Sequence, residues 1–260
     1  MISLEELKSK AKLKGLGLGN AEKDYLLDLV LFWISKNTRD ELIFKGGTCL
    51  YKFYGLGRFS EDVDFTAAKP IDVERLLQSI TSGIEQFGIN CHVREKREPF
   101  NSVLATIRCE GPLYNGTPQT YSSVRIDINK KSGIDMVPVL KNYSSIYPEI
   151  PSFSILTMQE VEIMAEKVRA IVTRNKARDL YDLWHLMTKG IIIDKNVIAK
   201  KLEYYKAEFN YAEFEKAVKE KESVWERDLK PLIRNLPDFN EIQKSVLSEA
   251  KKWNSRKKRQ

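Results

Sequence analysis

Asp62 and Asp64 are separated by a single residue in the sequence SEDVDF, which spans residues 60–65. On an extended segment both carboxylates project from the same side, because successive side chains of a strand alternate between its faces. Carboxylate oxygens are preferred ligands of Mg²⁺, which often shares its coordination shell with substrate phosphates. The alternative is that both acids belong to an ordinary surface turn. However, the neighbours Val63 and Phe65 are apolar, and a carboxylate without a partner in such surroundings costs free energy of folding. We therefore predict a Mg²⁺ (or Mn²⁺) site built on Asp62 and Asp64.

Gly46, Gly47 and Thr48 precede these acids and are typical of an anion-binding turn. Glycine lets the backbone approach a bulky anion that a Cβ would block. Thr48 stands where a helix is expected to begin, so backbone N–H groups, the helix dipole and a hydroxyl would all face that anion. We interpret the three residues as a cradle for the phosphates of a nucleotide.

Three polar residues flank the cradle and the acids. Lys45 and Arg58 either contact phosphate or balance the charge of the carboxylates. Ser60 is placed to hydrogen-bond the loop that presents Asp62, which is a supporting role.

A third acid, Asp127, stands in the sequence SVRIDINK. Val124, Ile126 and Ile128 alternate toward a core, so Asp127 and Arg125 share the opposite face of the expected strand. If this strand lies beside the one that carries Asp62 and Asp64, three carboxylates converge, as two-metal phosphoryl transfer requires. The alternative is an edge-strand acid neutralised by Arg125 or a lysine.

The composition is that of an ordinary globular protein, with 42% hydrophobic and 30% charged residues among 260. The net charge of +7 and the basic end KKWNSRKKRQ are compatible with a polyanionic partner such as RNA, without establishing one. Three cysteines without a CxxC pair and only two histidines argue against a disulfide framework, a zinc site and a histidine-rich metal site. No apolar run reaches the roughly 18 residues of a membrane span, and the first residues lack the apolar core of a signal peptide, so we predict no membrane partner and a cytoplasmic location.

The predicted elements mix helices and strands up to about residue 138 and are almost entirely helical from Met158 onward. Hydrophobic periodicity predicts helices over 2–14, 21–36, 48–54 and 71–87, and strands over 42–44, 63–66, 89–96, 103–109 and 121–129. The glycines of 15–20 indicate a hinge or turn, and the prolines and serines of 141–155 indicate a surface linker. We predict an α+β fold with a mixed sheet in residues 1–155, followed by a helical domain with a basic tail in residues 156–260.

The glycine pair, the thirteen residues after Thr48 and the DxD motif together resemble the first motif of the polymerase-β-like nucleotidyltransferase superfamily. More narrowly, KGGTCLYKFYGLGRFSEDVDF and EVEIMAEKVRAIVTRNKARDLYDLWHL (160–186) resemble the AbiEii/AbiGii toxin family of toxin–antitoxin systems. The resemblance spans roughly residues 40–190, and residues 191–260 match nothing beyond a generic helical tail. It implies a polymerase-β-like domain followed by a C-terminal helical bundle, an NTP substrate, a cognate antitoxin and tRNA as one acceptor.

Five residues of the second segment resemble the site at which the family binds the incoming nucleotide. Lys167 and Arg174 are two helical turns apart on one face, and Arg178, Asp179 and Asp182 open the next helix. Lysine and arginine suit the triphosphate. The structural alternatives are an i,i+4 salt bridge between Arg178 and Asp182 and an ordinary first-turn position for Asp179.

The sequence therefore predicts transfer of a nucleoside monophosphate from an NTP to an acceptor, with Asp62, Asp64, Asp127 and Lys167 as catalytic residues. Two other readings remain open. The same fold could serve as a non-catalytic nucleotide- or RNA-binding module, which would gain nothing from clustered acids, or the acceptor could be a protein side chain.

Overall fold

A computed structural model describes residues 1–130 and 133–254 of the chain. Residues 255–260, which form the end of the predicted basic tail, lie outside the described part. The chain forms two compact units, each assembled from separate segments. The sheet unit comprises Met1–Phe53, Ser60–Ile134 and Pro138–Met158, and the helical unit comprises Tyr54–Phe59, Asp135–Val137 and the chain from Gln159 onward.

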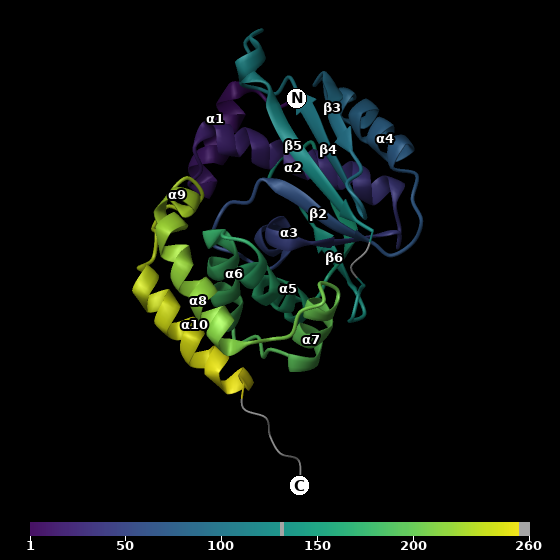
Figure 1. Ribbon diagram of the computed structural model, residues 1–260. Coiled ribbons are helices and arrows are strands. Elements are labelled where there is room, and N and C mark those ends of the chain that lie inside the picture. The colour runs from purple at the N-terminus through teal and green to yellow at the C-terminus, as the bar shows by residue number, and fades with distance from the viewer. Residues whose placement is uncertain (131–132, 255–260) are drawn as a thin grey trace. The chain divides into compact units, whose positions relative to one another are not determined.

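The described part of the sheet unit contains a mixed sheet, the α-helices α1 to α4 and the 3-10 helix η1 (Figure 1). In chain order its elements are α1 (Leu4–Lys14), α2 (Leu18–Asn37), β1 (Leu42–Lys45), α3 (Gly46–Phe53), β2 (Asp62–Ala67), α4 (Val73–Glu85), β3 (Cys91–Arg97), β4 (Ser102–Cys109), η1 (Pro118–Thr120), β5 (Ser122–Asn129), β6 (Val139–Tyr143) and β7 (Phe153–Thr157). Since α2 begins at Leu18, the predicted glycine hinge is confined to the turn at residues 15–17.

The seven strands described here lie in the order β3-β4-β5-β2-β1-β7-β6. The pairs β2–β5 and β1–β7 are parallel and the other pairs are antiparallel, so the sheet is mixed. Val124, Ile126 and Ile128 of β5 are buried on the face that packs against α2, and α4 packs on β3. Figure 1 shows α2 and α4 behind these strands. The α+β prediction with a mixed sheet is confirmed.

The prediction of a linker over residues 141–155 is wrong, because this segment holds most of β6 and β7. Both strands have only five residues, and polar side chains such as Lys141, Asn142 and Ser154 conceal their alternation. Pro148 and Pro151, which suggested a linker, lie in the connection between the two strands. A proline there removes no hydrogen bond from the sheet.

The helical unit consists of α5 (Glu160–Thr173), α6 (Ala177–Thr188), α7 (Lys195–Glu203), α8 (Tyr211–Glu220), η2 (Lys221–Val224), α9 (Trp225–Leu229) and α10 (Phe239–Asn254). The buried helix α5 contacts α6, α7 and α8. The segment Asp135–Val137 belongs to this unit since Glu162 of α5 accepts hydrogen bonds from the backbone N–H groups of Asp135 and Met136, at 2.8 and 3.2 Å. The predicted helical C-terminal region is therefore present.

No helix in the described ranges is long and apolar enough to cross a membrane.

Candidate functional site

The predicted phosphate cradle forms where β1 ends and α3 begins. Gly46 adopts a left-handed conformation with φ of +76°, which favours glycine. A Cβ on Gly46 would lie 2.2 Å from Oδ2 of Asp64, so this backbone must pass directly against the Asp64 carboxylate. The N–H groups of the first turn of α3, including Gly47 and Thr48, have no partners within the helix and can serve as donors to an anion.

The hydroxyl of Thr48 holds the start of α3 against the acid-bearing strand. Thr48 is fully buried, and its Oγ1 donates to the carbonyl oxygen of Asp62 and lies 2.9 Å from Oγ of the buried Ser60. Ser60 therefore contacts Thr48 directly, and its predicted role in supporting the loop that presents Asp62 stays a prediction. The Thr48 side chain ties the cradle to β2, which leaves backbone N–H groups as the cradle's donors.

The strand register brings the predicted carboxylates onto one sheet face. Asp64 of β2 is paired with Lys45 of β1 on one side and with Asp127 of β5 on the other. Asp62 lies two residues from Asp64 on the same face. Adjacency of the two acid-bearing strands, on which the role of Asp127 depended, is confirmed, and Lys45 is a buried cation in the same row.

Arg125 neutralises Asp62 rather than Asp127. Its Nε and Nη2 donate to the two Asp62 oxygens at 2.8 and 2.7 Å, and its side chain is 66% exposed. Among the described residues no three His, Cys, Asp or Glu side chains form a ready-made metal site. Asp64 and Asp127 suit a Mg²⁺ ion nevertheless, because Mg²⁺ is usually bound by one or two carboxylates together with substrate oxygens.

A buried ion network in the helical unit contains most of the other predicted residues. Arg58 donates from Nε and Nη2 to both oxygens of Asp182 at 2.7 Å. Lys167 Nζ lies 2.7 Å from Asp182 Oδ2 and 3.1 Å from Asp179 Oδ1, and Arg174 donates to both oxygens of Asp179. Both aspartates are almost completely buried. The network joins the segment before β2 to α5 and α6.

The charges of this network depend on one another. Burial alone would raise the pKa of Asp182, but Arg58 and then Lys167 lower that pKa below its usual range. Burial alone would lower the pKa of Lys167, but Asp182 and then Asp179 raise it. Arg178, in the first turn of α6, has no ion pair among the described residues, so the alternative salt bridge between Arg178 and Asp182 does not form.

We expect this network to make the folded protein acid-sensitive. The pKa values of Asp179 and Asp182 are lowered on folding, so their contribution to the free energy of unfolding is complete above the unfolded value of about 4. It decreases as the pH falls below that value, because the unfolded chain then binds more protons. Urea unfolding between about pH 6 and pH 3 should show this loss.

An Asp182→Asn variant should be less stable at neutral pH, by about 3–5 kcal/mol, since it leaves Arg58 with an uncompensated buried charge. Its difference from the unmodified protein should shrink as the pH falls. Glu208→Gln, which removes an exposed carboxylate of the same unit, is the control. A constant difference between Asp182→Asn and the unmodified protein across this pH range would contradict the expectation.

A second buried network lies in the sheet unit and was not predicted. Lys52 of α3 is 1% exposed and pairs with Asp24 and Asp28 of α2, with Nζ 2.6 Å from Asp24 Oδ1 and 2.5 Å from Asp28 Oδ1. Tyr143 and Ser145 donate to Asp28. The sequence contains a signal for this network, because Asp24 and Asp28 are four residues apart among the apolar residues of α2. The network anchors α3, whose first turn is the cradle.

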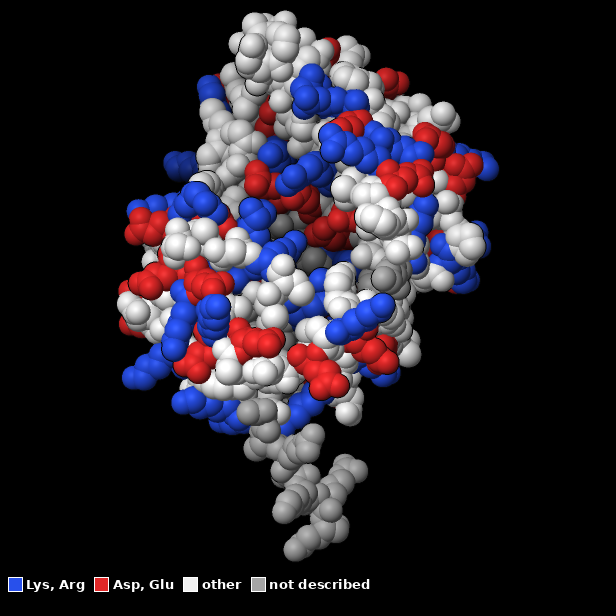
Figure 2. All heavy atoms as spheres, in the orientation of Figure 1, with Lys and Arg blue, Asp and Glu red and all other residues white. Residues whose placement is uncertain are grey.

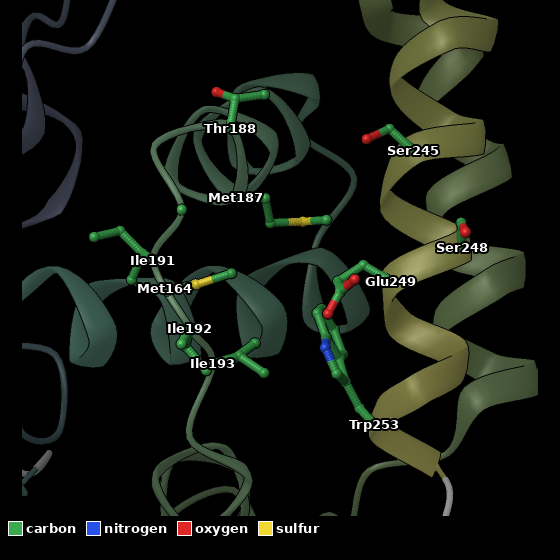
Figure 3. A pocket seen from close by; sticks show the side chains of 11 residues that line it. Met164, Met187, Thr188, Ile191, Ile192, Ile193, Ser245, Ser248, Glu249 and Trp253 are labelled. Atoms are coloured by element: carbon green, nitrogen blue, oxygen red, sulfur yellow. The ribbon is translucent and has the colours of Figure 1, made fainter.

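The helical unit also contains a pocket of about 500 Å³. Across it, Ser245, Glu249 and Trp253 of α10 face Met164, Met187 and Ile193 (Figure 3). None of the predicted site residues lines this pocket.

The mixed sheet, the glycine-led helix and the paired carboxylates in register define the architecture of a nucleotidyltransferase. Two solved structures share this fold. The nucleotidyltransferase toxin MenT4 of Mycobacterium tuberculosis is 19% identical, with a TM-score of 0.69 over 97% of this chain and 93% of that one. JHP933 of Helicobacter pylori is 21% identical, with a TM-score of 0.57 over 92% and 93%. None of the functionally curated proteins matches the sequence significantly.

The family model described as nucleotidyl transferase AbiEii toxin, type IV TA system, matches residues 33–250. The chain belongs to this AbiEii family of nucleotidyltransferase toxins. Membership confirms the resemblance drawn from the two sequence segments and implies an antitoxin partner.

Proposed function

We propose that the chain transfers a nucleoside monophosphate from an NTP to an acceptor hydroxyl, in a reaction that requires Mg²⁺ or Mn²⁺. The acceptor hydroxyl would release its proton to water and its oxygen would bond to the α-phosphorus. The bond from that phosphorus to the oxygen that bridges the α- and β-phosphates would break, and pyrophosphate would leave. The observation that carries the proposal is the register of Asp64 with Asp127, beside the first turn of α3. A non-catalytic polyanion-binding module has no use for two adjacent carboxylates.

The sheet unit would supply the groups around the reacting phosphate. The N–H groups of Gly46, Gly47 and Thr48 would bind the β- and γ-phosphates. Asp64 and Asp127 would hold the cation, and Asp62 would join them once Arg125 releases it. The cation would lower the pKa of the acceptor hydroxyl and offset the charge of the triphosphate.

The helical unit would supply cations for the nucleotide. We assign phosphate contacts to Lys167, Arg174 and Arg178. The buried carboxylates Asp179 and Asp182 would act indirectly, because they hold Lys167 and Arg174 in place. Arg58 would likewise act through Asp182.

An Asp64→Asn variant should lower the transfer rate by at least about 100-fold, since a lost cation ligand removes several kcal/mol of transition-state stabilisation. The assay follows label from each α-labelled NTP into total tRNA and into protein of a cell extract, in the presence of Mg²⁺. Asp40→Asn, which removes an exposed carboxylate of the same unit, is the control and should transfer normally.

Label that enters tRNA supports an RNA acceptor, and label that enters protein supports the alternative of a protein side chain. Nucleotide binding without transfer to either acceptor would overturn the proposed enzyme. In cells, expression without the antitoxin should slow growth, and an Asp62→Asn/Asp64→Asn variant should not.

A further inference from the structure

The sheet face that carries the carboxylates continues across β5, β4 and β3. Along β5, Asp127 and Arg125 are followed on the same face by Ser123. Ser123 is paired with Arg108 of β4, and Arg108 is paired with the exposed His92 of β3. Paired residues of an antiparallel ladder share a face, so these basic side chains and the catalytic acids lie on one surface. In Figure 2, basic and acidic side chains alternate over the region where Figure 1 draws these strands.

Aromatic rings gather at the end of this surface. Tyr121 immediately precedes β5 with an extended backbone, two residues before Ser123, and so faces the same way. Its ring lies 4.7 Å from the Tyr114 ring and 6.0 Å from the imidazole of His92, between centroids. The guanidinium carbon of Arg108 lies 5.1 Å from the centre of the Tyr121 ring. Four side chains, from β3, β4 and the connection between β4 and β5, thus form one cluster.

Arg108 differs from Arg125 on the same face. Arg125 is neutralised by Asp62, whereas Arg108 has no carboxylate partner in the described ranges. Its Nε–H is buried and has no acceptor there. Nearby acids are already engaged, because Glu110 accepts from Tyr121 and Asn90 and Glu95 pairs with Arg97. Arg108 is therefore a cation held by an aromatic ring, with donors to offer.

We propose that Arg108, Tyr114, Tyr121 and His92 bind the single-stranded end of an acceptor RNA and lead it along β5 toward Asp127. The proposal rests on the proposed function, whose acceptor class it names. Ser123 and Asp127 are four positions apart along β5, which is about 13 Å along the strand. That span lets a short run of nucleotides connect the aromatic cluster to the carboxylates.

A single strand fits this surface better than a duplex or an acidic polypeptide. Unpaired bases expose the faces that stack on aromatic rings and on guanidinium groups, whereas a duplex hides them. An acidic polypeptide would pair with Arg108 but would gain nothing from Tyr114 and His92. The guanidinium of Arg108 suits a phosphodiester, and the rings beside it suit the adjoining bases.

The test measures binding of a fluorescent single-stranded oligoribonucleotide of about ten nucleotides to the full chain, by anisotropy, without NTP or metal. A blunt duplex of the same sequence and polyglutamate serve as competitors. Arg108→Gln should weaken binding by about 5-fold or more and reduce the slope of log K against log salt by about 0.7, the value for one phosphate contact on a single strand. Tyr114→Leu should weaken binding without changing that slope, and Tyr114→Phe should bind normally. Lys69→Gln, which removes an exposed cation of the same unit, should bind normally.

Equal binding by Arg108→Gln and Lys69→Gln would overturn the proposal. So would competition by the duplex or polyglutamate as strong as that by the unlabelled single strand. Because the assay requires no transfer, it separates the two hypotheses. An inactive protein with the expected binding pattern contradicts only the proposed function, and an active protein without that pattern contradicts only the RNA surface.

Discussion

Replacement of Lys52 by methionine is expected to lower the free energy of unfolding by about 3–5 kcal/mol at neutral pH. Lys52 is buried and pairs with two buried carboxylates, Asp24 and Asp28. Without Lys52, the hydrogen-bond partners of Asp28 within the described part of the chain are the neutral side chains of Tyr143 and Ser145. Urea unfolding of the purified variant measures the loss.

The dependence of this loss on pH identifies its cause. Burial raises the pKa of Asp28 even while Lys52 is present, so the folded variant should bind a proton more readily than the unfolded chain. The variant should therefore recover stability as the pH falls, and a second change, Asp28→Asn, should restore part of it at neutral pH. Lys14→Met removes the partly exposed lysine on Asp24 and should cost less. Equal losses for Lys14→Met and Lys52→Met would contradict this account.

Gly46→Ala is expected to reduce nucleotide transfer by at least about 100-fold while the protein remains folded. The new Cβ would meet the Asp64 carboxylate at 2.2 Å and displace either the cradle or this proposed cation ligand. The left-handed backbone adds a strain of about 1–2 kcal/mol. The measurements are the label-transfer assay and a thermal melt.

Gly190→Ala separates the clash from the strain. Gly190 has nearly the same conformation, with φ of +77°, and a Cβ there would meet no atom within 4 Å. The two variants should lose similar stability from backbone strain, but only Gly46→Ala should lose transfer. Equal transfer by both variants would show that the close approach of the Gly46 backbone to Asp64 is not required for transfer.

The local parts of the site were predictable from sequence. The glycines at the start of α3 and the alternation in β2 and β5 are signals that neighbouring residues carry by themselves. The role of Asp127 depended on which strands become neighbours, so the sequence could only state it as a condition, and the parallel pairing of β2 with β5 meets that condition. Strands β6 and β7 were missed because five polar-rich residues give too weak an alternation.

The ion pairs of the site were not predictable from spacing. The structural alternative paired Asp182 with Arg178, one helical turn away, but Asp182 pairs with Arg58, which is distant in the chain. Similarly, Arg125 of β5 pairs with Asp62 on the neighbouring strand β2, and not with Asp127, which is two positions away on its own strand. Spacing along the chain identifies only near neighbours as partners, whereas the fold brings Arg58 to Asp182 and Arg125 to Asp62.

The segment 54–59 has a consequence for how the protein is made. It connects the cradle to the acid-bearing strand, yet its contacts belong to the helical unit: Arg58 binds Asp182, 124 positions later, and the Phe59 N–H donates to the carbonyl oxygen of Leu232. A ribosome therefore delivers the whole glycine–DxD motif long before it delivers the partners of this connection. A nascent or prematurely ended chain that extends past β5 carries Asp62, Asp64 and Asp127, the proposed catalytic carboxylates. It lacks the contacts of residues 54–59 with Asp182 and Leu232, which only longer synthesis provides.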